Sequence, residues 1–113
     1  MKIFFTGHFR QQLKKLMKKF PHAADDLLDV LEKLNLENEV SIGKSIYKVR
    51  IGSTDMKKGK SGGFRAYIYL YRRKELLVPL CIYAKTEQVA ISENELQYHV
   101  DKMNEELLGK AGT

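Results

Sequence analysis

Residues 46–85 read IYKVRIGSTDMKKGKSGGFRAYIYLYRRKELLVPLCIYAK, and this stretch decides the fold. Apolar residues alternate with polar or aromatic ones in three runs, which is the period of half-buried strands. The predicted strands are about Ile46–Gly52, about Gly63–Arg72 and about Leu76–Lys85. The connection Arg73-Lys74-Glu75 is a tight hairpin, whereas Ser53–Gly62 is polar, basic and glycine-containing and is expected to be a surface loop. The stretch therefore predicts a mainly antiparallel sheet.

Alternate side chains of a strand point to opposite faces, so these runs predict which face of the sheet is buried. The expected core set is Tyr47, Val49, Ile51, Phe64, Ala66, Ile68, Leu70, Val78, Leu80 and Ile82. The opposite face receives Lys48, Arg50, Arg65, Tyr67, Tyr69, Tyr71, Cys81, Tyr83 and Lys85. Pro79 has no N–H to donate inside its strand, which predicts a β-bulge or an unpaired side there.

A short strand and three helices are expected on either side of this stretch. Lys2 to Thr6 is a strand closed by Gly7, and Pro21 ends the helix that follows. The expected buried stripes of the three helices are Phe9, Leu13, Leu16, Met17 and Phe20; Leu27, Leu28, Leu31 and Leu34; and Leu96, Val100, Met103 and Leu107. A capping box starting at Ser92 opens the last helix. The order β-α-α-β-β-β-α predicts an α+β fold with the helices packed on one face of the sheet.

The chain has 113 residues, of which 43% are hydrophobic and 30% are charged. This length predicts a single domain, residues 1–113, and excludes multidomain enzymes and repeat arrays. No uncharged run approaches the roughly 18–20 apolar residues of a membrane span, so we expect a cytoplasmic protein without a membrane partner. One cysteine, Cys81, and three scattered histidines exclude an internal disulfide and a zinc-type site, and no cofactor is expected. His8, His22 and His99 are expected at the surface.

Charge is distributed unevenly along the chain. Residues 1–21 carry six basic and no acidic residues, whereas residues 22–43 carry one basic and six acidic. Residues 44–74 carry ten basic and one acidic, and residues 75–113 carry three basic and seven acidic. A strongly basic block between acidic blocks predicts a positive field focused on one place in the fold. The expected partner of such a field is a phosphate backbone.

The open face of the predicted sheet combines cations with aromatic rings. Its members are Lys48, Arg50, Arg65, Tyr67, Tyr83 and Lys85, beneath the lysine-rich loop. Guanidinium groups bind phosphate bidentately and tyrosine rings stack on unpaired bases, which favours binding of single-stranded nucleic acid. The alternative is a solvated surface with ordinary cross-strand tyrosine packing.

A nucleotide-binding P-loop is excluded, because the spacing from Gly52 to Gly59 is too long and a strand follows instead of a helix.

Three segments of the sequence resemble a known family. They are Ile46-Tyr47-Lys48-Val49-Arg50, Lys57-Lys58-Gly59-Lys60-Ser61-Gly62-Gly63-Phe64-Arg65 and Ile82-Tyr83-Ala84-Lys85-Thr86-Glu87. In this order and spacing they are similar to the RelE/ParE superfamily of bacterial type II toxins, nearest to its HigB-like mRNA interferases. The likeness extends from Phe4 to the last helix, and the order of the predicted elements agrees.

The resemblance implies a ribosome-dependent endoribonuclease that cuts messenger RNA without a metal and is silenced by a cognate, DNA-binding antitoxin. In such enzymes the ribose 2′-hydroxyl attacks the adjacent phosphate and leaves a cyclic phosphate. Matching positions imply catalytic roles for Lys57, Lys58, Lys60, Arg65 and Lys85, and RNA contacts from Lys48, Arg50, Tyr67 and Tyr83. An arginine would stabilise the charge that builds on the phosphate oxygens. Crowding by other cations lowers the pKa of a lysine and suits it to proton transfer.

The sequence departs from this family after the third predicted strand. Thr86 stands where several relatives have an arginine, and no tyrosine occurs in Val89-Ala90-Ile91, where those relatives have one. If that tyrosine stacks on a base in the relatives, Tyr67 or Tyr83 has to replace it here.

Two other functions stay open at this point, a gyrase-poisoning toxin of the same fold and a non-catalytic RNA-binding module. Gyrase-directed members generally lack the lysine loop and the strand arginine, so Arg65 and its neighbouring lysines argue against the first.

The antitoxin can mask the basic face or dock elsewhere and block entry to the ribosome. The acidic second helix, with Asp25, Asp26 and Asp29, favours docking on the helical side.

Overall fold

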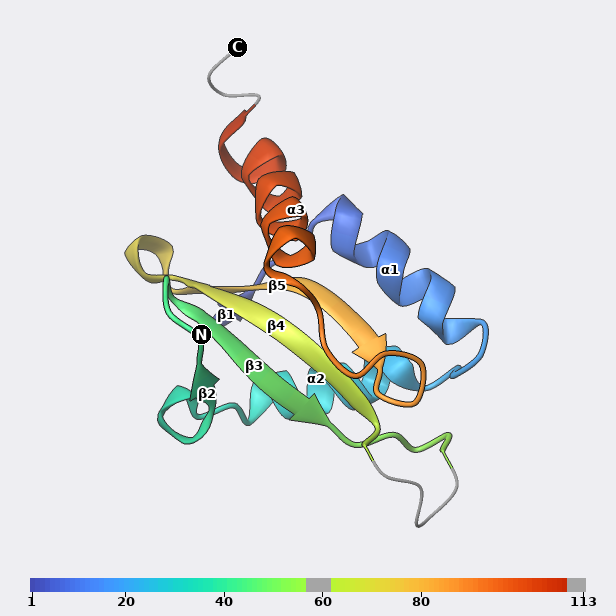
Figure 1. The fold of residues 1–113 in the computed structure, drawn as a ribbon. Helices are drawn as coiled ribbons and strands as arrows, with labels where there is room; N and C mark the ends of the chain where they lie inside the picture. The colour runs from blue at the N-terminus through green and yellow to red at the C-terminus, as the bar shows by residue number, and fades with distance from the viewer. Residues whose placement is uncertain (57–61, 110–113) are drawn as a thin grey trace.

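The sheet has five strands, and the computed structural model describes residues 1–56 and 62–109 of the chain. The strands are β1 (Lys2–Ile3), β2 (Val40–Ser41), β3 (Ile46–Ile51), β4 (Phe64–Tyr71) and β5 (Leu76–Ala84). Their order across the sheet is β1-β5-β4-β3-β2, as Figure 1 shows. Only β1 pairs in parallel, with β5, and the other pairs are antiparallel. The predicted α+β fold with a mainly antiparallel sheet is confirmed.

Three α-helices and three short helical turns complete the described part of the chain. The helices are α1 (Gly7–Met17), α2 (Ala23–Glu32) and α3 (Glu93–Asn104), and the turns are η1 (Leu36–Asn38), η2 (Arg72–Lys74) and the π-helical η3 (Glu105–Gly109). The predicted cap of the last helix is present, because the Glu95 amide donates to Ser92 Oγ at 3.0 Å. Strand β2 was not predicted, since a strand of two exposed residues has no period to detect.

The helices lie on both faces of the sheet, so the prediction that all of them pack on one face is wrong. Helices α1 and α2 cover the predicted core face, where Phe9 and Leu27 are fully buried against Phe64 and its neighbours. Helix α3 packs on the opposite face, and its Met103 belongs to a second cluster with Tyr67. In Figure 1, α3 lies in front of the sheet and α2 behind it.

A β-bulge in β5 explains this second core. Tyr67 pairs with Cys81 and the next residue, Ile68, pairs with Pro79, so Leu80 has no partner on β4. The irregularity predicted at Pro79 is confirmed, but it also changes which face the preceding residues occupy. Val78 and Leu80, expected under α1 and α2, lie instead in the cluster with α3. These apolar residues give α3 a surface to bury.

Candidate functional site

The middle of the face expected to be open is covered by α3. Tyr67 is 5% exposed and Tyr83 is 8% exposed, and their rings stack with centroids 6.5 Å apart. Leu96 and Val100 of α3 pack against the same cluster. The expectation of open aromatic rings at these two positions is therefore wrong for this structure, because the rings form part of a second core.

Burial also fixes the protonation of two groups in this core. Burial, with a smaller contribution from neighbouring Tyr67, raises the pKa of Tyr83 to about 12. The Tyr83 hydroxyl therefore stays protonated near neutral pH, and it donates to the Val89 carbonyl at 3.5 Å. Burial likewise raises the pKa of the Cys81 thiol to about 12, so Cys81 is no nucleophile near neutral pH. Both groups serve the packing of α3.

The open part of this face begins where β3 ends and β4 starts. Arg50 pairs with Arg65 across β3 and β4, and Arg65 pairs with Tyr83 across β4 and β5. Two guanidinium groups thus face each other on neighbouring strands, an arrangement of like charges that destabilises a sheet. Arg50 is exposed and Arg65 is half-buried against the aromatic core.

Arg65 carries an unsatisfied donor. Its Nε is buried and has no hydrogen-bond partner within the described residues. None of the ion pairs formed in residues 1–56 and 62–109 includes Arg65 or Arg50. A buried guanidinium nitrogen without a partner costs free energy, and an anionic ligand would remove that cost. The arrangement is suited to bind a phosphate.

Lys85 joins this end of the sheet through two glycines. The Lys85 amide donates to the Gly63 carbonyl at 3.0 Å. A Cβ added at Gly62 would lie 2.6 Å from Lys85 Cδ, so the side chain of Lys85 lies directly on this glycine. Gly63 has a φ of +51°, and its added Cβ would lie 2.2 Å from the Ile51 carbonyl oxygen. The glycine pair lets the chain enter β4 in close contact with the end of β3, and sequence reasoning did not assign it this role.

Four of the other predicted positions lie apart from this point or beyond the described residues. Lys48 pairs with the buried Tyr67 and borders an open groove of about 670 Å³ between β2–β4 and α3. Lys48 lies two residues before Arg50 on β3, on the same face of the sheet as the Arg50–Arg65 pair. Lys57, Lys58 and Lys60 lie outside the described residues. The structure therefore brings together Arg50, Arg65 and Lys85, with Tyr83 beneath them.

The connection that leaves β3 is fixed to the start of α2, which the sequence did not reveal. The Thr54 amide donates to Asp26 at 2.9 Å, and His22 Nδ1 lies 2.7 Å from Asp55 Oδ1. The hydrogen bond to Asp55 raises the pKa of His22, and the same bond lowers the pKa of Asp55. These contacts join residues 28 and 33 positions apart, and no local sequence pattern predicts contacts over such distances.

The other two histidines join α1 to α3 and lie away from this site. His8 Nε2 and His99 Nδ1 are 2.7 Å apart, and burial lowers the pKa of both rings. The surface position expected for His99 is wrong, because only 9% of it is exposed. Glu106 accepts hydrogen bonds from the Gly7 and His8 amides at 2.7 and 3.0 Å and so caps α1. These contacts hold α3 in place.

The described residues contain neither a cluster of metal-ligating side chains nor a helix that could cross a membrane. No three His, Cys, Asp or Glu side chains come together as a metal site in residues 1–56 and 62–109. Within the same residues, no helix has the length and apolar character to cross a membrane. At the end of the sheet, Arg50, Arg65 and Lys85 gather without acidic partners among the ion pairs of residues 1–56 and 62–109.

Comparison with known proteins identifies the family. Residues 1–111 match the family described as RelE toxin of the RelE / RelB toxin-antitoxin system. The fold is similar to that of E. coli toxin RelE, solved in the free state as a variant with two arginines changed to alanine. That match has a TM-score of 0.53 and 15% sequence identity, and it covers 90% of this chain and 95% of the other. No curated protein matches the sequence, and the nearness to HigB-like members stays a prediction. Because the family match spans nearly the whole chain, this protein belongs to the RelE toxin family.

Proposed function

We propose that this protein is the toxin of a type II toxin–antitoxin pair and cuts messenger RNA on the ribosome. The observation that carries the proposal is the buried Nε of Arg65, which lies opposite Arg50 and has no hydrogen-bond partner in the described part of the chain. Two guanidinium groups, with Lys85 at the same end of the sheet, supply positive charge that attracts a phosphodiester. Membership of the RelE toxin family supports the same conclusion.

The proposed reaction is an internal transfer at phosphorus. The 2′-hydroxyl oxygen attacks the adjacent phosphorus, the bond to the 5′ oxygen breaks, and the products are a 2′,3′-cyclic phosphate and a 5′-hydroxyl. Arg65 binds the phosphate and stabilises the charge that develops on its oxygens. Arg50 and Lys85 bind the same or the neighbouring phosphate. No metal takes part in this scheme.

Proton transfer needs one base and one acid. We assign these steps to the lysine set of Lys57, Lys58, Lys60 and Lys85, of which the first three lie outside the described residues. Tyr83 is unsuited to be the base, because its pKa of about 12 keeps the hydroxyl protonated. Tyr67 and Tyr83 act in this proposal as the packed support of Arg65, while Lys48 binds RNA farther along the face.

A RelB-type antitoxin is the implied protein partner, and the ribosome and messenger RNA are the implied targets. We propose that the antitoxin docks on α2, whose Asp25 is exposed and not engaged in any ion pair of the described residues. Asp26 is less available, because it already accepts from Thr54.

The proposal is tested by inducing the protein in bacteria and mapping message ends by primer extension. Wild-type protein should produce cuts in phase with codons, and Arg65→Ala at equal expression should produce none. DNA damage without message cuts would indicate a gyrase-directed toxin instead. Growth without either effect, with the folded protein bound to RNA, would indicate a non-catalytic module.

A further inference from the structure

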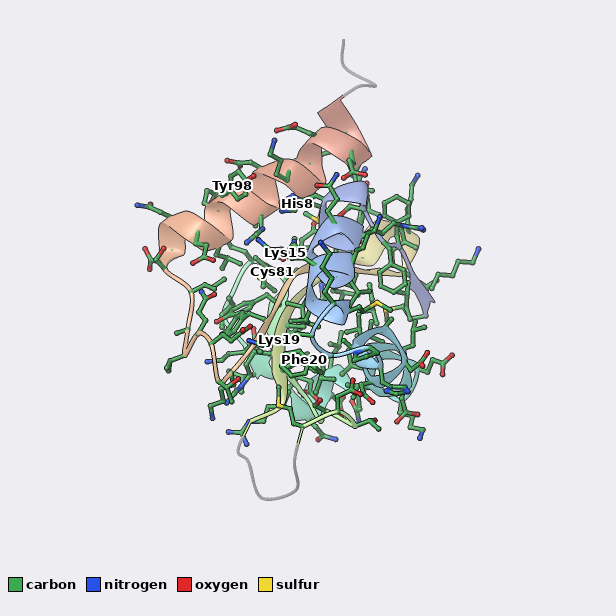
Figure 2. All side chains as sticks on the ribbon, turned by 90° about the vertical axis from the view of Figure 1, so that its right-hand side faces the viewer. His8, Lys15, Lys19, Phe20, Cys81 and Tyr98 are labelled. Carbon is green, nitrogen blue, oxygen red and sulfur yellow. The ribbon has the colours of Figure 1, made fainter. Side chains whose placement is uncertain are left out.

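Helix α1 carries basic residues that the proposed cleavage site does not use. It has no acidic residue, and its cations are Arg10, Lys14 and Lys15 within the helix and Lys18 and Lys19 directly after it. All five are exposed. Figure 2 looks onto α1 from outside, with Lys15 labelled on the helix and Lys19 labelled just beyond its C-terminal end.

Three of these cations form a row along the helix. Arg10, Lys14 and Lys18 are four residues apart, and Lys18 still has helical dihedral angles. Residues at this spacing lie on one side of a helix, about 6 Å apart along its axis. In the described part of the chain no acidic side chain pairs with any of the three, whereas Lys19 pairs with Glu87 at 2.6 Å.

Helix stability alone does not account for this row. Cations in the last turn are favourable because they face the negative end of the helix dipole, which suits Lys14 and Lys18. Arg10 lies in the first turn and a half, where a cation is unfavourable, and like charges four residues apart repel. A bound polyanion would remove the repulsion along the row.

The apolar side of α1 decides between the possible polyanions. Phe9 is completely buried, and Leu13, Leu16 and Met17 pack against the same core. Helices that bind a lipid surface insert an apolar face into it, and α1 has none left to insert. A protein interface also needs an apolar centre, which the row lacks. A phosphate backbone requires only cations in a row.

The row leads towards the cleavage site. The Lys19–Glu87 pair joins the C-terminal end of α1 to the turn that follows β5, two residues beyond Lys85. RNA that crosses Arg65 and Lys85 can therefore continue around the edge of the sheet onto α1.

We propose that Arg10, Lys14 and Lys18 form a second RNA-binding surface, which holds the phosphate backbone outside the segment that is cut. This inference rests on the proposed function only in taking RNA as the ligand. It requires no cleavage, so it is tested with an RNA that cannot be cut.

The test measures binding of a fluorescein-labelled 20-nucleotide single-stranded RNA with 2′-O-methyl groups throughout, by anisotropy across a salt series. The row variant is Arg10→Gln with Lys14→Gln and Lys18→Gln. The matched control is Arg72→Gln with Arg73→Gln and Lys74→Gln, which removes the same charge from the exposed η2 turn at the opposite end of β4. Each lost contact to a single strand lowers the salt slope by about 0.7. The row variant should therefore lose about 2 in slope and about 100-fold in affinity near 0.1 M salt.

Equal binding by the row variant and wild type, or an equal loss in the η2 control, would overturn the proposal. Vesicles of phosphatidylglycerol and phosphatidylethanolamine provide the second arm. Loss of vesicle binding in the row variant with RNA binding intact would overturn it in favour of a membrane surface. If wild type cuts no message but the row variant alone loses RNA binding, this inference stands and the proposed cleavage fails. Circular dichroism melting confirms that each variant is folded.

Discussion

One face of the sheet has two halves, one that α3 covers and one that lies beyond α3. Both are built from the same strands, but they differ in burial and in the pairing of their polar groups. Under α3, Tyr67 and Tyr83 are buried and their rings are stacked. Beyond α3, Arg50 and Arg65 face each other across two strands, and the buried Nε of Arg65 has no partner among residues 1–56 and 62–109. The first half is stabilising by burial, whereas the second is destabilising in the absence of a ligand.

This difference supports our proposal that the first half serves stability and the second half serves the proposed function. A protein that only needed to fold would not place two arginines opposite each other beside an aromatic core. The first half borders the second, because Arg65 pairs with Tyr83 across β4 and β5 and lies two residues from Tyr67 on the same face of β4. Substitutions in the first half should therefore lower the free energy of unfolding most, whereas substitutions in the second half should lower message cleavage most.

The largest effect on stability is expected under α3. Tyr67→Ala removes a nearly fully buried aromatic ring and should lower the free energy of unfolding by about 3–5 kcal/mol. Tyr67→Phe keeps the ring and should cost about 1 kcal/mol or less. Urea unfolding followed by circular dichroism measures both. A cost below about 1 kcal/mol for Tyr67→Ala would mean that α3 does not bury this ring in solution.

The largest effect on activity is expected beyond α3. Arg65→Ala should reduce message cleavage on programmed ribosomes by about 10²–10³, the usual loss for one donor to a transition state. Its free energy of unfolding should stay near the wild-type value, because the change also removes the repulsion from Arg50. Arg72→Ala, just past the other end of β4, is the control and should cut normally. Full activity of Arg65→Ala would remove this residue from the mechanism.

The entry of the chain into β4, beside the end of β3, requires a glycine at position 63. Gly63→Ala should destabilise the protein by about 1–3 kcal/mol, because φ is +51° and the new Cβ would lie 2.2 Å from the Ile51 carbonyl oxygen. Gly52→Ala is the control, since its Cβ would have no atom within 4 Å. Thermal melting compares the two. Equal melting temperatures would show that the backbone around Gly63 and Ile51 accommodates a Cβ without cost.

The smallest effect is expected on the acidic helix, remote from both halves. Asp25→Lys with Asp29→Lys should slow antitoxin association several-fold and make it less sensitive to salt, with toxicity alone unchanged. Glu93→Lys with Asp101→Lys makes the same charge change on exposed positions of α3 and should leave the rate unaltered. Stopped-flow measurement at two ionic strengths decides. An unaltered rate in the α2 variant, with a large loss when Lys57, Lys58 and Lys60 are neutralised, would place the antitoxin over the open end.

Much of the fold, and the face on which the cations lie, was predictable from the sequence, because both follow from local periodicity. The core stripes on α1 and α3, the antiparallel strands and the positions of Lys48, Arg50 and Arg65 on one face all follow from periods of 3.6 and 2. Pro79 correctly marked the bulge, since its missing N–H is a local property.

The failures concern contacts between distant residues. The bulge moved Val78 and Leu80 to the other face, which created a core for α3 and buried Tyr67 and Tyr83. Leu28 was expected in a buried stripe but is 36% exposed. Neither the packing face of α3 nor the anchoring of Asp55 to His22 has a signal in local spacing. The aromatic residues were therefore identified but assigned to the wrong environment.

The most direct test of a metal-independent cleavage site at Arg65 is the chemistry of the RNA ends. Chelators are unusable on ribosomes, which need magnesium, so the cut message should be purified from programmed ribosomes and its termini identified by mass spectrometry. Our account predicts a 2′,3′-cyclic phosphate and a 5′-hydroxyl, both lost with Arg65→Ala. A 3′-hydroxyl with a 5′-phosphate, or the same ends at full yield from Arg65→Ala, would contradict it.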